Sequence, residues 1–329
     1  MKSKKMKVIR SAVGSMPSLG LIRELQKRGV EVIGVDANPL SFGLYLLKRS
    51  YVIPPGNHPN FIREISEIID MEQPDAILSG PEEELLALSR NKKEIEEKGT
   101  LVLCPDYPYV RICADKKRTN EALRDIEIPI PEVYVDKASV KYPCIVKPRF
   151  GRGSVGINVV KDEEDLNLYF RNFDEQVIQR FVQGNEYTID VLADQEGNAL
   201  SIVPRLRLQT ESGVSVKGKT TYDAKIIEYS KKIAKELKLF GPSCIQCIKN
   251  KEGLNFIEVN TRFGGGSILS VKADPTIMTN LINIIKRKKT KPSKGFKEGL
   301  IMLRYHSEVF LTEDIIKRDA FLTDSTEPY

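Results

Sequence analysis

The stretch FIEVNTRFGGG, at residues 256–266, constrains the fold more than any other part of the sequence. On a strand, alternate side chains share a face, so Glu258, Asn260 and Arg262 would project together while the residues between them face a core. A carboxylate beside an amide oxygen suits Mg²⁺, and an arginine one step further can hold a phosphoryl oxygen. A half-exposed strand with polar side chains is the alternative. The three glycines that follow count against it, because such backbone freedom is costly unless a close approach requires it.

A hairpin is predicted from the residues that lead into this stretch. Residues 243–248 and 254–259 read as two strands joined over Lys251-Glu252-Gly253, which would bring Gln246 opposite Glu258. Cys244 and Cys247 spell CxxC on the first strand. Residues three apart on a strand point to opposite faces, so we expect buried thiols there and no metal or redox pair.

A second informative stretch is KPRFGRGSVG, at residues 147–156, in which Lys147 ends a strand just before a loop with three glycines. Glycines let a backbone approach a polyphosphate closely, and the amides together with the lysine can neutralise it. The Walker A pattern GxxxxGK[ST] is absent from the chain. A basic cluster at 115–118 precedes this loop and marks a predicted helix start.

The first hundred or so residues alternate strand and helix signals, which predicts a parallel sheet with helices on both faces, a Rossmann-like unit. Ser18 is expected to cap the first helix. The dinucleotide fingerprint GxGxxG fails, because its second and third glycines would fall on Met16 and Leu19. An NAD-dependent enzyme that binds at Asp36, the end of the second strand, stays as an alternative. From about residue 142 the signals become antiparallel, with hairpins and a long helix over 224–237.

Composition bounds the class of protein. The chain has 329 residues, 41% of them hydrophobic and 29% charged, as in an ordinary globular protein with room for two or three packed units. The five cysteines are odd in number and scattered, which disfavours a disulfide framework. With no apolar run near 20 residues and no signal-peptide pattern, we expect a cytoplasmic protein with no membrane partner. The formal charge of +6 arises in the basic run 286–297, a predicted solvated connection, so nucleic acid is disfavoured as a partner.

In this order these features resemble the ATP-grasp superfamily, and within it a single module of the large subunit of carbamoyl-phosphate synthetase. The resemblance extends from the Rossmann-like start to about Gly266 and the strand near Leu300. It implies an ATP-grasp fold, α/β and α+β, with an N-terminal Rossmann-like (pre-ATP-grasp) domain over 1–110. Residues 111–184 would form the small ATP-grasp subdomain with a glycine-rich lid, and residues 185–329 the large subdomain with the metal site. Since a full synthetase needs two such modules, we expect a stand-alone ligase.

The resemblance also implies roles for individual residues. The groups that would bind ATP phosphates, adenine and ribose are Lys116, Lys147, Gly151, Gly153, Ser154, Gly156, Gln179, Arg180, Phe181, Val182 and Glu186. The implied metal ligands are Gln246, Glu258 and Asn260, and the implied catalytic residues are Arg262, Lys147 and Arg205. Arg207, Lys217 and Lys219 would extend a basic surface for phosphate or acidic substrate. Arg180 stands where an acidic residue is frequent, and Thr261 replaces a common proline.

The implied cofactors are ATP and two Mg²⁺ ions, with Mn²⁺ as an alternative metal. The implied reaction activates a small carboxylate, an amino acid or related metabolite, as an acyl phosphate and couples it to an amine. Relatives of this kind are often dimers, so a homodimer is also implied. A catalytically silent ATP-binding sensor or docking subunit of the same fold is the alternative from another functional class.

Overall fold

The computed structural model describes residues 5–151, 153 and 155–319. The chain divides into two compact units, each described separately below. Unit 1 contains the described residues up to 107, together with 278–290 and 304–319, and unit 2 contains 108–277 and 291–303. In the described part of the chain, no helix is both long and apolar enough to span a membrane.

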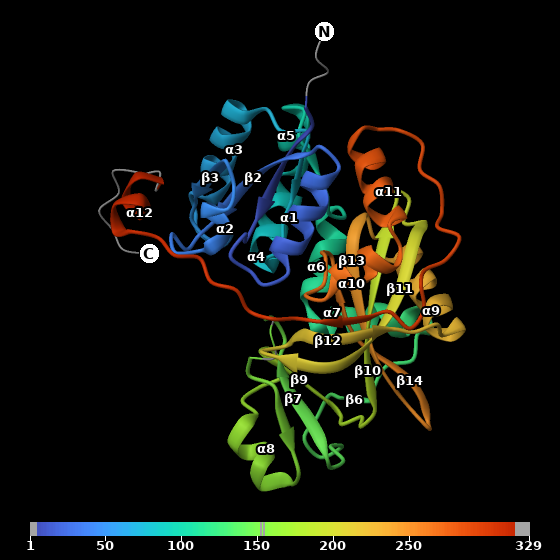
Figure 1. Ribbon diagram of the computed structural model, residues 1–329. Helices are drawn as coiled ribbons and strands as arrows, with labels where there is room; N and C mark the ends of the chain where they lie inside the picture. The colour runs from blue at the N-terminus through green and yellow to red at the C-terminus, as the bar shows by residue number, and fades with distance from the viewer. Residues whose placement is uncertain (1–4, 152, 154, 320–329) are drawn as a thin grey trace. The chain divides into compact units, whose positions relative to one another are not determined.

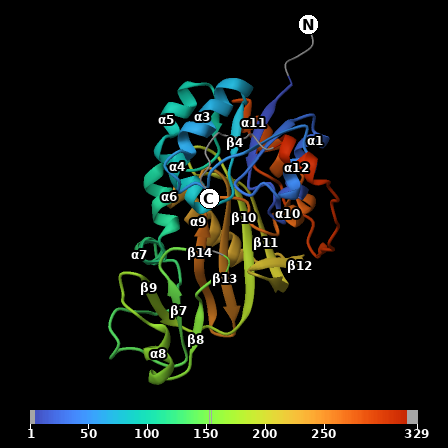
Figure 2. The same cartoon turned by 90° about the vertical axis from the view of Figure 1, so that its left-hand side faces the viewer.

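Unit 1 is built on a five-stranded parallel sheet in the order β3-β2-β1-β4-β5. The strands are β1 (Lys7–Ser11), β2 (Glu31–Asp36), β3 (Arg49–Val52), β4 (Ala76–Leu78) and β5 (Leu101–Val102). The helices that follow them are α1 (Ser18–Lys27), α2 (Phe42–Tyr45), α3 (Phe61–Glu72), α4 (Glu82–Arg90) and α5 (Lys92–Glu97), and α12 (Glu313–Asp319) is added later in the chain. Helix α1 lies on one face of the sheet and α3 to α5 on the other (Figure 2). The predicted Rossmann-like unit is confirmed.

Polar groups gather where β1 and β4 end, the point at which the strand order reverses. Arg10 is buried and donates to the Leu78 carbonyl at 3.0 Å and to Ser18 Oγ at 3.1 Å. Helix α1 begins at Ser18, and Pro17 occupies the N-cap position without a side-chain hydrogen bond. The prediction that Ser18 caps the helix was therefore wrong. Its hydroxyl instead donates to the Ala12 carbonyl at 2.8 Å, which ties the first turn to the strand end.

Two carboxylates at this end of the sheet are engaged by groups of the chain itself. Asp36 accepts hydrogen bonds from the Gly14 amide at 2.8 Å and from the Asn38 amide at 3.0 Å, so it holds the first turn of the unit. Glu84 accepts from Ser79 Oγ at 2.7 Å, and its burial raises the pKa of the carboxyl to about 7. The Asp36 contacts do not favour the NAD alternative, which needs that carboxylate for a ribose.

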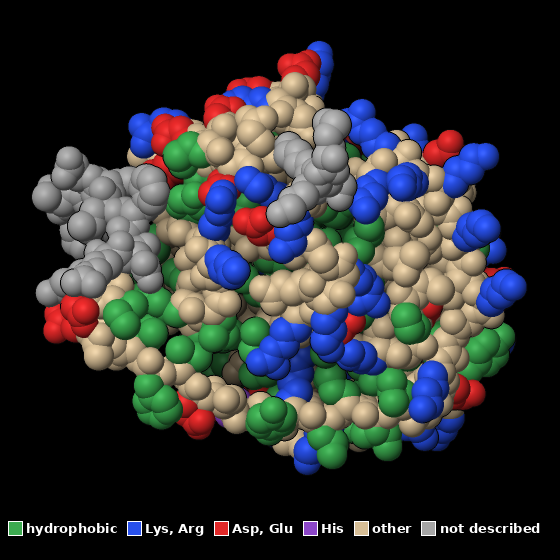
Figure 3. Space-filling model, turned by 45° about the horizontal axis from the view of Figure 1, so that its top comes forward, with side chains coloured by type: hydrophobic (Ala, Val, Ile, Leu, Met, Phe, Trp, Pro, Cys, Tyr) green, Lys and Arg blue, Asp and Glu red, His purple; other side chains and the backbone are tan. Residues whose placement is uncertain are grey.

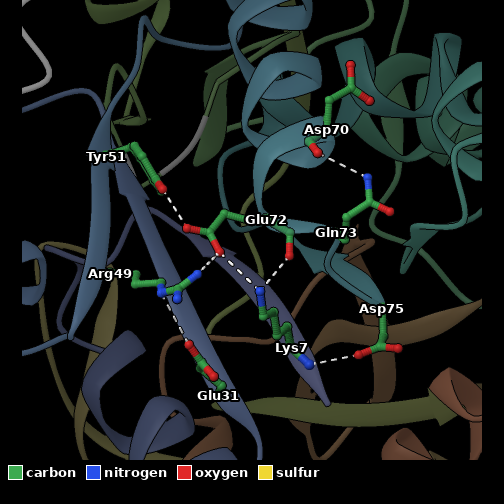
Figure 4. Close-up of polar contacts among 8 residues, drawn as sticks. All are labelled: Lys7, Glu31, Arg49, Tyr51, Asp70, Glu72, Gln73 and Asp75. Carbon is green, nitrogen blue, oxygen red and sulfur yellow. Dashed lines mark hydrogen bonds and ion pairs between the residues drawn. The ribbon is translucent and has the colours of Figure 1, made fainter. Parts of the chain in front are cut away.

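At the opposite end of the sheet, where the strands begin, a network of hydrogen bonds and ion pairs is centred on Glu72 (Figure 4). Glu72 accepts from Tyr51 Oη at 2.6 Å, from Lys7 Nζ at 3.2 Å and from Arg49 Nη1. Glu31 lies 3.5 Å from Arg49 Nε, which extends the network to the start of β2. The last residue of α3 thus holds the first residues of β1 and β3 in place.

Replacing Glu72 by alanine is expected to lower the free energy of unfolding by about 2–3 kcal/mol, the scale of lost hydrogen bonds to a charged group. Burial raises the pKa of Glu72, but hydrogen bonds from Tyr51, Arg49 and Lys7 outweigh it, so the net pKa lies below the ordinary value. The stabilisation is therefore present above the unfolded-state pKa and is lost as pH falls through the folded-state pKa. Denaturant unfolding of wild type and variant from neutral to acid pH would measure this. An equal difference at all pH values would contradict it.

Unit 2 begins with α6 (Tyr107–Ala114) and α7 (Lys116–Asp125) and contains two antiparallel sheets. The smaller, in the order β6-β9-β7-β8, consists of β6 (Val133–Tyr134), β7 (Cys144–Pro148), β8 (Asn158–Val160) and β9 (Gln176–Arg180). Helix α8 (Glu163–Tyr169) packs on it through Leu166, in a core that includes Val146 and Ile178.

The larger sheet has six strands in the order β14-β13-β10-β11-β12-β15. They are β10 (Asn185–Ala193), β11 (Ala199–Glu211), β12 (Val214–Thr220), β13 (Gly241–Asn250), β14 (Gly253–Asn260) and β15 (Ile301–Leu303). One face packs against α7 and α9 (Ala224–Glu236), with Ile189, Ile245 and Val259 in the shared core. Helices α10 (Ser267–Ala273) and α11 (Thr276–Ile285) follow β14 in the chain (Figure 1). The antiparallel half of the fold prediction is confirmed.

The basic run that supplies the formal charge is exposed. The side chains of Lys286, Arg287, Lys288 and Lys289 follow α11 and lie open to solvent, as predicted for a solvated connection. In the face drawn in Figure 3, basic side chains lie among acidic and uncharged ones.

Candidate functional site

A row of polar residues crosses the larger sheet on the face turned away from the α7–α9 core. Strand register places Glu258 opposite Gln246, Gln246 opposite Thr188, Thr188 opposite Arg205, and Arg205 opposite Thr220. Directly opposite residues share a face and lie about 5 Å apart. The predicted pairing of Gln246 with Glu258 is therefore present. Thr188 was missed by the sequence analysis, because only the register of strands distant in sequence reveals it.

A second row lies beside the first and contains Asn260, Cys244 and Asp190, one from each of β14, β13 and β10. Cys244 is buried, and burial raises the pKa of its thiol to about 12, so the thiol stays protonated. Cys247 belongs to the core on the other face, as the spacing predicted.

An irregularity in the β13–β14 pairing determines on which face of the sheet Glu258 lies. The register shifts between Gln246 and Cys247, so that Cys247 faces Phe256 while Gln246 faces Glu258. The extra residue of this β-bulge is Ile257, which is half-buried and does not enter the core that strict alternation predicts for it. The bulge lets Phe256 face the core and Glu258 the polar face, although the two lie two positions apart.

Lys147 is the penultimate residue of β7 and is 6% exposed, an uncommon degree of burial for a lysine. Burial lowers the pKa of its ammonium to about 8; Lys116 lowers it further, whereas the carboxylate of Glu258 acts in the opposite direction. The structure therefore brings Lys116, Lys147 and Glu258 close enough to interact electrostatically. All three were site predictions.

The glycine loop is joined to the start of α7. Lys116 Nζ donates to the Gly151 carbonyl at 2.8 Å, and Gly151, Gly153 and Gly156 all have positive φ. L side chains rarely adopt that conformation, so the loop needs its glycines. Ser154, predicted to bind nucleotide, lies outside the described residues.

An ion pair that the sequence analysis missed fixes the base of this loop. Asp115 caps α7 and accepts two hydrogen bonds from Arg149, Nε to Oδ1 at 2.8 Å and Nη2 to Oδ2 at 2.7 Å. Burial raises the pKa of Asp115, but the Arg149 guanidinium and the α7 amides outweigh it and hold the pKa below the usual value. The bidentate pair connects the end of β7 to the lysine-bearing helix.

The predicted adenine-binding hinge, residues 179–182, begins with the last two residues of β9. Gln179 is buried and donates to Asn120 Oδ1 at 3.1 Å, so it anchors the hinge to α7. The amides of Arg180 and Phe181 donate within unit 2, to the Glu132 and Pro143 carbonyls at 2.8 and 3.2 Å. The Arg180 side chain pairs with Glu252 of the β13–β14 turn at 3.0 Å, which gives this unusual arginine a partner. Val182, the last hinge residue, is buried.

Glu186, predicted to hold ribose hydroxyls, is half-buried on β10 and forms an ion pair with Arg207 of β11. Arg207 also donates to the Gly213 carbonyl at 2.8 Å. Lys217 and Lys219 are exposed on β12, and the register sets Lys219 opposite Leu206, on the other face of the sheet from Arg205 and Arg207. The register therefore places Arg205 and Arg207 on one face of the sheet and Lys217 and Lys219 on the other.

Arg205 lies deeper than predicted for a substrate-contacting residue. It is 0% exposed, and its Nε donates to Asp190 Oδ2 at 2.6 Å. Arg262, by contrast, is half-buried and donates to the Phe263 carbonyl at 3.2 Å.

Residues 264–266 need to be glycine because of space, and none of them is among the positive-φ glycines. A Cβ on Gly266 would lie 2.3 Å from Arg205 Nη1, and one on Gly265 would lie 2.8 Å from Val214 Cγ1. The sequence predicted that another group lies close to the backbone of this segment. In the structure, that group is formed by side chains of the larger sheet, Arg205 and Val214.

Replacing Gly266 by alanine is expected to lower the free energy of unfolding by about 1–3 kcal/mol, as for an overpacked interior. Gly218→Ala is the matched control, because its Cβ would meet the Leu206 carbonyl oxygen at 3.4 Å, an ordinary contact. Urea unfolding of the two variants gives the comparison. Equal stability would show that the segment moves away freely.

The oxygen donors of the site fit a hard divalent cation. One carboxylate, Glu258, lies beside the amide groups of Gln246 and Asn260, and no group of three or more His, Cys, Asp or Glu side chains that could hold a metal occurs among the described residues. Such a sparse set suits Mg²⁺, which usually takes one or two carboxylates and completes its shell with water and substrate phosphates.

Two domain families match the chain. The ATP-grasp domain family matches residues 113–266, and the family described as PylC-like, N-terminal domain matches residues 19–103. The carbamoyl-phosphate synthase of Methanobrevibacter smithii is 25% identical over 266 residues, which cover 75% of this chain and 71% of the relative. The 3-methyl-D-ornithine--L-lysine ligase of Methanosarcina barkeri is 26% identical over 248 residues, 72% of this chain and 62% of that enzyme.

Among solved structures, the biotin carboxylase domain of Hydrogenobacter thermophilus 2-oxoglutarate carboxylase, in complex with MgADP and bicarbonate, has a TM-score of 0.71 at 17% identity. The likeness covers 91% of this chain and 74% of that one and concerns the fold. The two family matches show that the chain carries an ATP-grasp domain preceded by a PylC-like N-terminal domain.

Proposed function

We propose that this protein is an ATP-dependent carboxylate–amine ligase. The observation that carries the proposal is the convergence of Lys116, Lys147 and Glu258, with Gln246 and Asn260 on the same sheet face. The ammonium groups of Lys147, which is buried, and of Lys116, beside oxygen donors for a divalent cation, suit the transfer of a phosphoryl group, since such catalysis is mainly positioning and charge stabilisation.

In the proposed reaction, a carboxylate oxygen of the substrate attacks the γ-phosphorus of ATP, and the bond from that phosphorus to the ADP oxygen breaks. Lys116, Lys147 and Arg262 would stabilise the charge on the transferring group. Bound Mg²⁺, held by Glu258, Asn260 and Gln246, would neutralise charge on the phosphates. An amine then attacks the acyl carbon of the acyl phosphate, phosphate leaves, and the amine loses a proton.

The remaining predicted residues have supporting roles in this proposal. The glycine loop with Ser154 would cover the phosphates and exclude water from the acyl phosphate. The hinge at 179–182 would receive adenine and Glu186 the ribose, with Arg207 holding Glu186 in place. The proposed domain limits are 1–110, 111–184 and 185–329, and a homodimer, a second Mg²⁺ and use of Mn²⁺ belong to the same proposal.

An amino acid or related metabolite is the proposed carboxylate substrate. A relative whose name gives it as a ligase of 3-methyl-D-ornithine with L-lysine supports this class. The MgADP complex of a structural neighbour supports ATP and Mg²⁺ as cofactors.

The test is phosphate release from MgATP with carboxylates and amines supplied singly and in pairs, and with hydroxylamine as a trap. Release that depends on one carboxylate and yields its hydroxamate is the expected result. Tight ATP binding with no release under any combination would contradict the ligase and favour the sensor of the same fold.

A further inference from the structure

The pair formed by Arg205 and Asp190 has buried polar atoms that nothing satisfies. Arg205 Nη1 and Nη2 and Asp190 Oδ1 have no hydrogen-bond partner within the described chain, although Arg205 is 0% and Asp190 2% exposed. Buried polar groups in native proteins are nearly always paired, so unpaired ones need an explanation such as a ligand. The unpaired atoms here are donors and an acceptor on adjacent side chains.

These side chains are held firmly from one side. Asp190 Oδ2 accepts both Arg205 Nε, at 2.6 Å, and Ser270 Oγ, at 2.5 Å. The plane of the guanidinium and the direction of the carboxylate are therefore fixed before any ligand arrives. Such preorganisation is typical of a binding site and reduces the entropic cost of binding.

The other side is covered by the glycine segment 264–266. The position of a Gly266 Cβ lies 2.3 Å from Arg205 Nη1, and that of a Gly264 Cβ lies 3.1 Å from Asp190 Oδ1. The cover thus lies directly over the unpaired atoms. A ligand would therefore have to displace this segment, whose three consecutive glycines have unusual backbone freedom.

We propose that Arg205 and Asp190 form a head-group subsite for an α-amino acid, exposed when the glycine segment lifts. The two Nη groups form a fork that matches a carboxylate, and Asp190 Oδ1 would accept from the α-ammonium. The pair and a zwitterion are each neutral, so burial leaves no net charge. A simple anion would satisfy Arg205 alone and leave Asp190 Oδ1 unpaired.

The subsite adjoins the phosphate-binding groups. Cys244 of β13 lies opposite Asp190 on one neighbouring strand and opposite Asn260, a proposed metal ligand, on the other. An amino acid held by Arg205 would therefore present its carboxylate on the reacting face. This inference rests on the proposed function and adds to it the residues that recognise the head group of the proposed amino acid substrate.

The test uses glycine, acetate and methylamine as probes of the full-length protein, with affinity measured by calorimetry and thermal stabilisation. Wild type should bind glycine more tightly than acetate and should not bind methylamine. Arg205→Gln should weaken glycine binding about 10- to 100-fold, the scale of a lost charge-assisted hydrogen bond. Asp190→Asn should remove the preference for glycine over acetate. Binding of a fluorescent ATP analogue should be unchanged in Asp190→Asn.

A single substitution can leave the partner's charge buried and unfold the protein. The double variant Arg205→Gln/Asp190→Asn keeps the site neutral and should also lose glycine binding. Glycine binding that is unaffected in these variants, or absent from wild type at high millimolar concentration, would overturn the subsite. Equal binding of acetate and glycine would overturn the amino acid assignment. Arg205-dependent glycine binding without phosphate release from any carboxylate would instead refute the ligase and leave the subsite standing.

Discussion

Replacing Glu258 by alanine is expected to reduce MgATP-dependent phosphate release by about 10²- to 10³-fold or more, the effect of removing one preorganised electrostatic group. Glu258 is the single carboxylate among the three proposed metal ligands, and it counteracts the repulsion between Lys147 and Lys116. Its loss removes a charged metal ligand and leaves two ammonium groups without their counter-charge. Turnover should fall while the fold is kept, because Glu258 is half-buried on the polar face of the sheet.

The measurement is steady-state phosphate release with increasing Mg²⁺ in wild type, Glu258→Ala and Glu258→Gln. The glutamine variant keeps the size and one oxygen donor, so excess Mg²⁺ should restore part of its activity. Glu228→Ala is the control, because Glu228 is an exposed carboxylate on α9 in the same unit. Near-normal release by Glu258→Ala would remove the metal assignment.

Replacing Lys147 by methionine, which keeps the length and apolar stem, is expected to weaken MgATP binding about 10- to 100-fold at pH 7. Burial and the nearby Lys116 lower the pKa of the Lys147 ammonium to about 8. The affinity of the wild-type protein for MgATP should therefore fall as pH rises above about 8. The ammonium binds the phosphates and the neutral amine does not. The variant should lack this pH dependence.

Stability of the ligand-free protein should show the opposite trend. The folded-state pKa of about 8 lies below the ordinary value of 10.5, so the folded protein releases this proton first as pH rises. The contribution of Lys147 to the free energy of unfolding then increases between those values, by roughly 3 kcal/mol in total. The free energy of unfolding is measured against pH for wild type and for Lys147→Met. The difference between the two curves gives the contribution of Lys147 without that of other titrating groups. Parallel curves would show that the ammonium is not buried in solution.

The sequence predicts the strands of unit 2 well because their signals are local. Alternation, turn residues and the hairpin over Lys251-Glu252-Gly253 set Gln246 opposite Glu258, and the structure has that pairing. Neither Thr188 nor the Arg205–Asp190 pair could be found this way. Their neighbours come from strands whose mutual order depends on the whole sheet, and register is fixed by packing as well as by turns.

Two local predictions failed for a physical reason that a single sequence hides. Ser18 has the right residue type for a helix cap, but its hydroxyl accepts from the buried guanidinium of Arg10 and donates to the Ala12 carbonyl. Ile257 has the right hydrophobicity for the core, but the bulge removes it from the alternating pattern. In both cases tertiary contacts override a correct local preference.

The discontinuity of unit 1 has a consequence for biosynthesis. Its five-stranded sheet is made first, but residues 278–290 and 304–319 of the same unit are translated after the whole ATP-grasp domain at 113–266. Domains tend to fold as they emerge from the ribosome, at about 5–20 residues per second. The strands of the parallel sheet are therefore synthesised about 10–40 seconds before the last segments of their own unit. Unit 1 is thus the part of a nascent chain that we expect chaperones to bind.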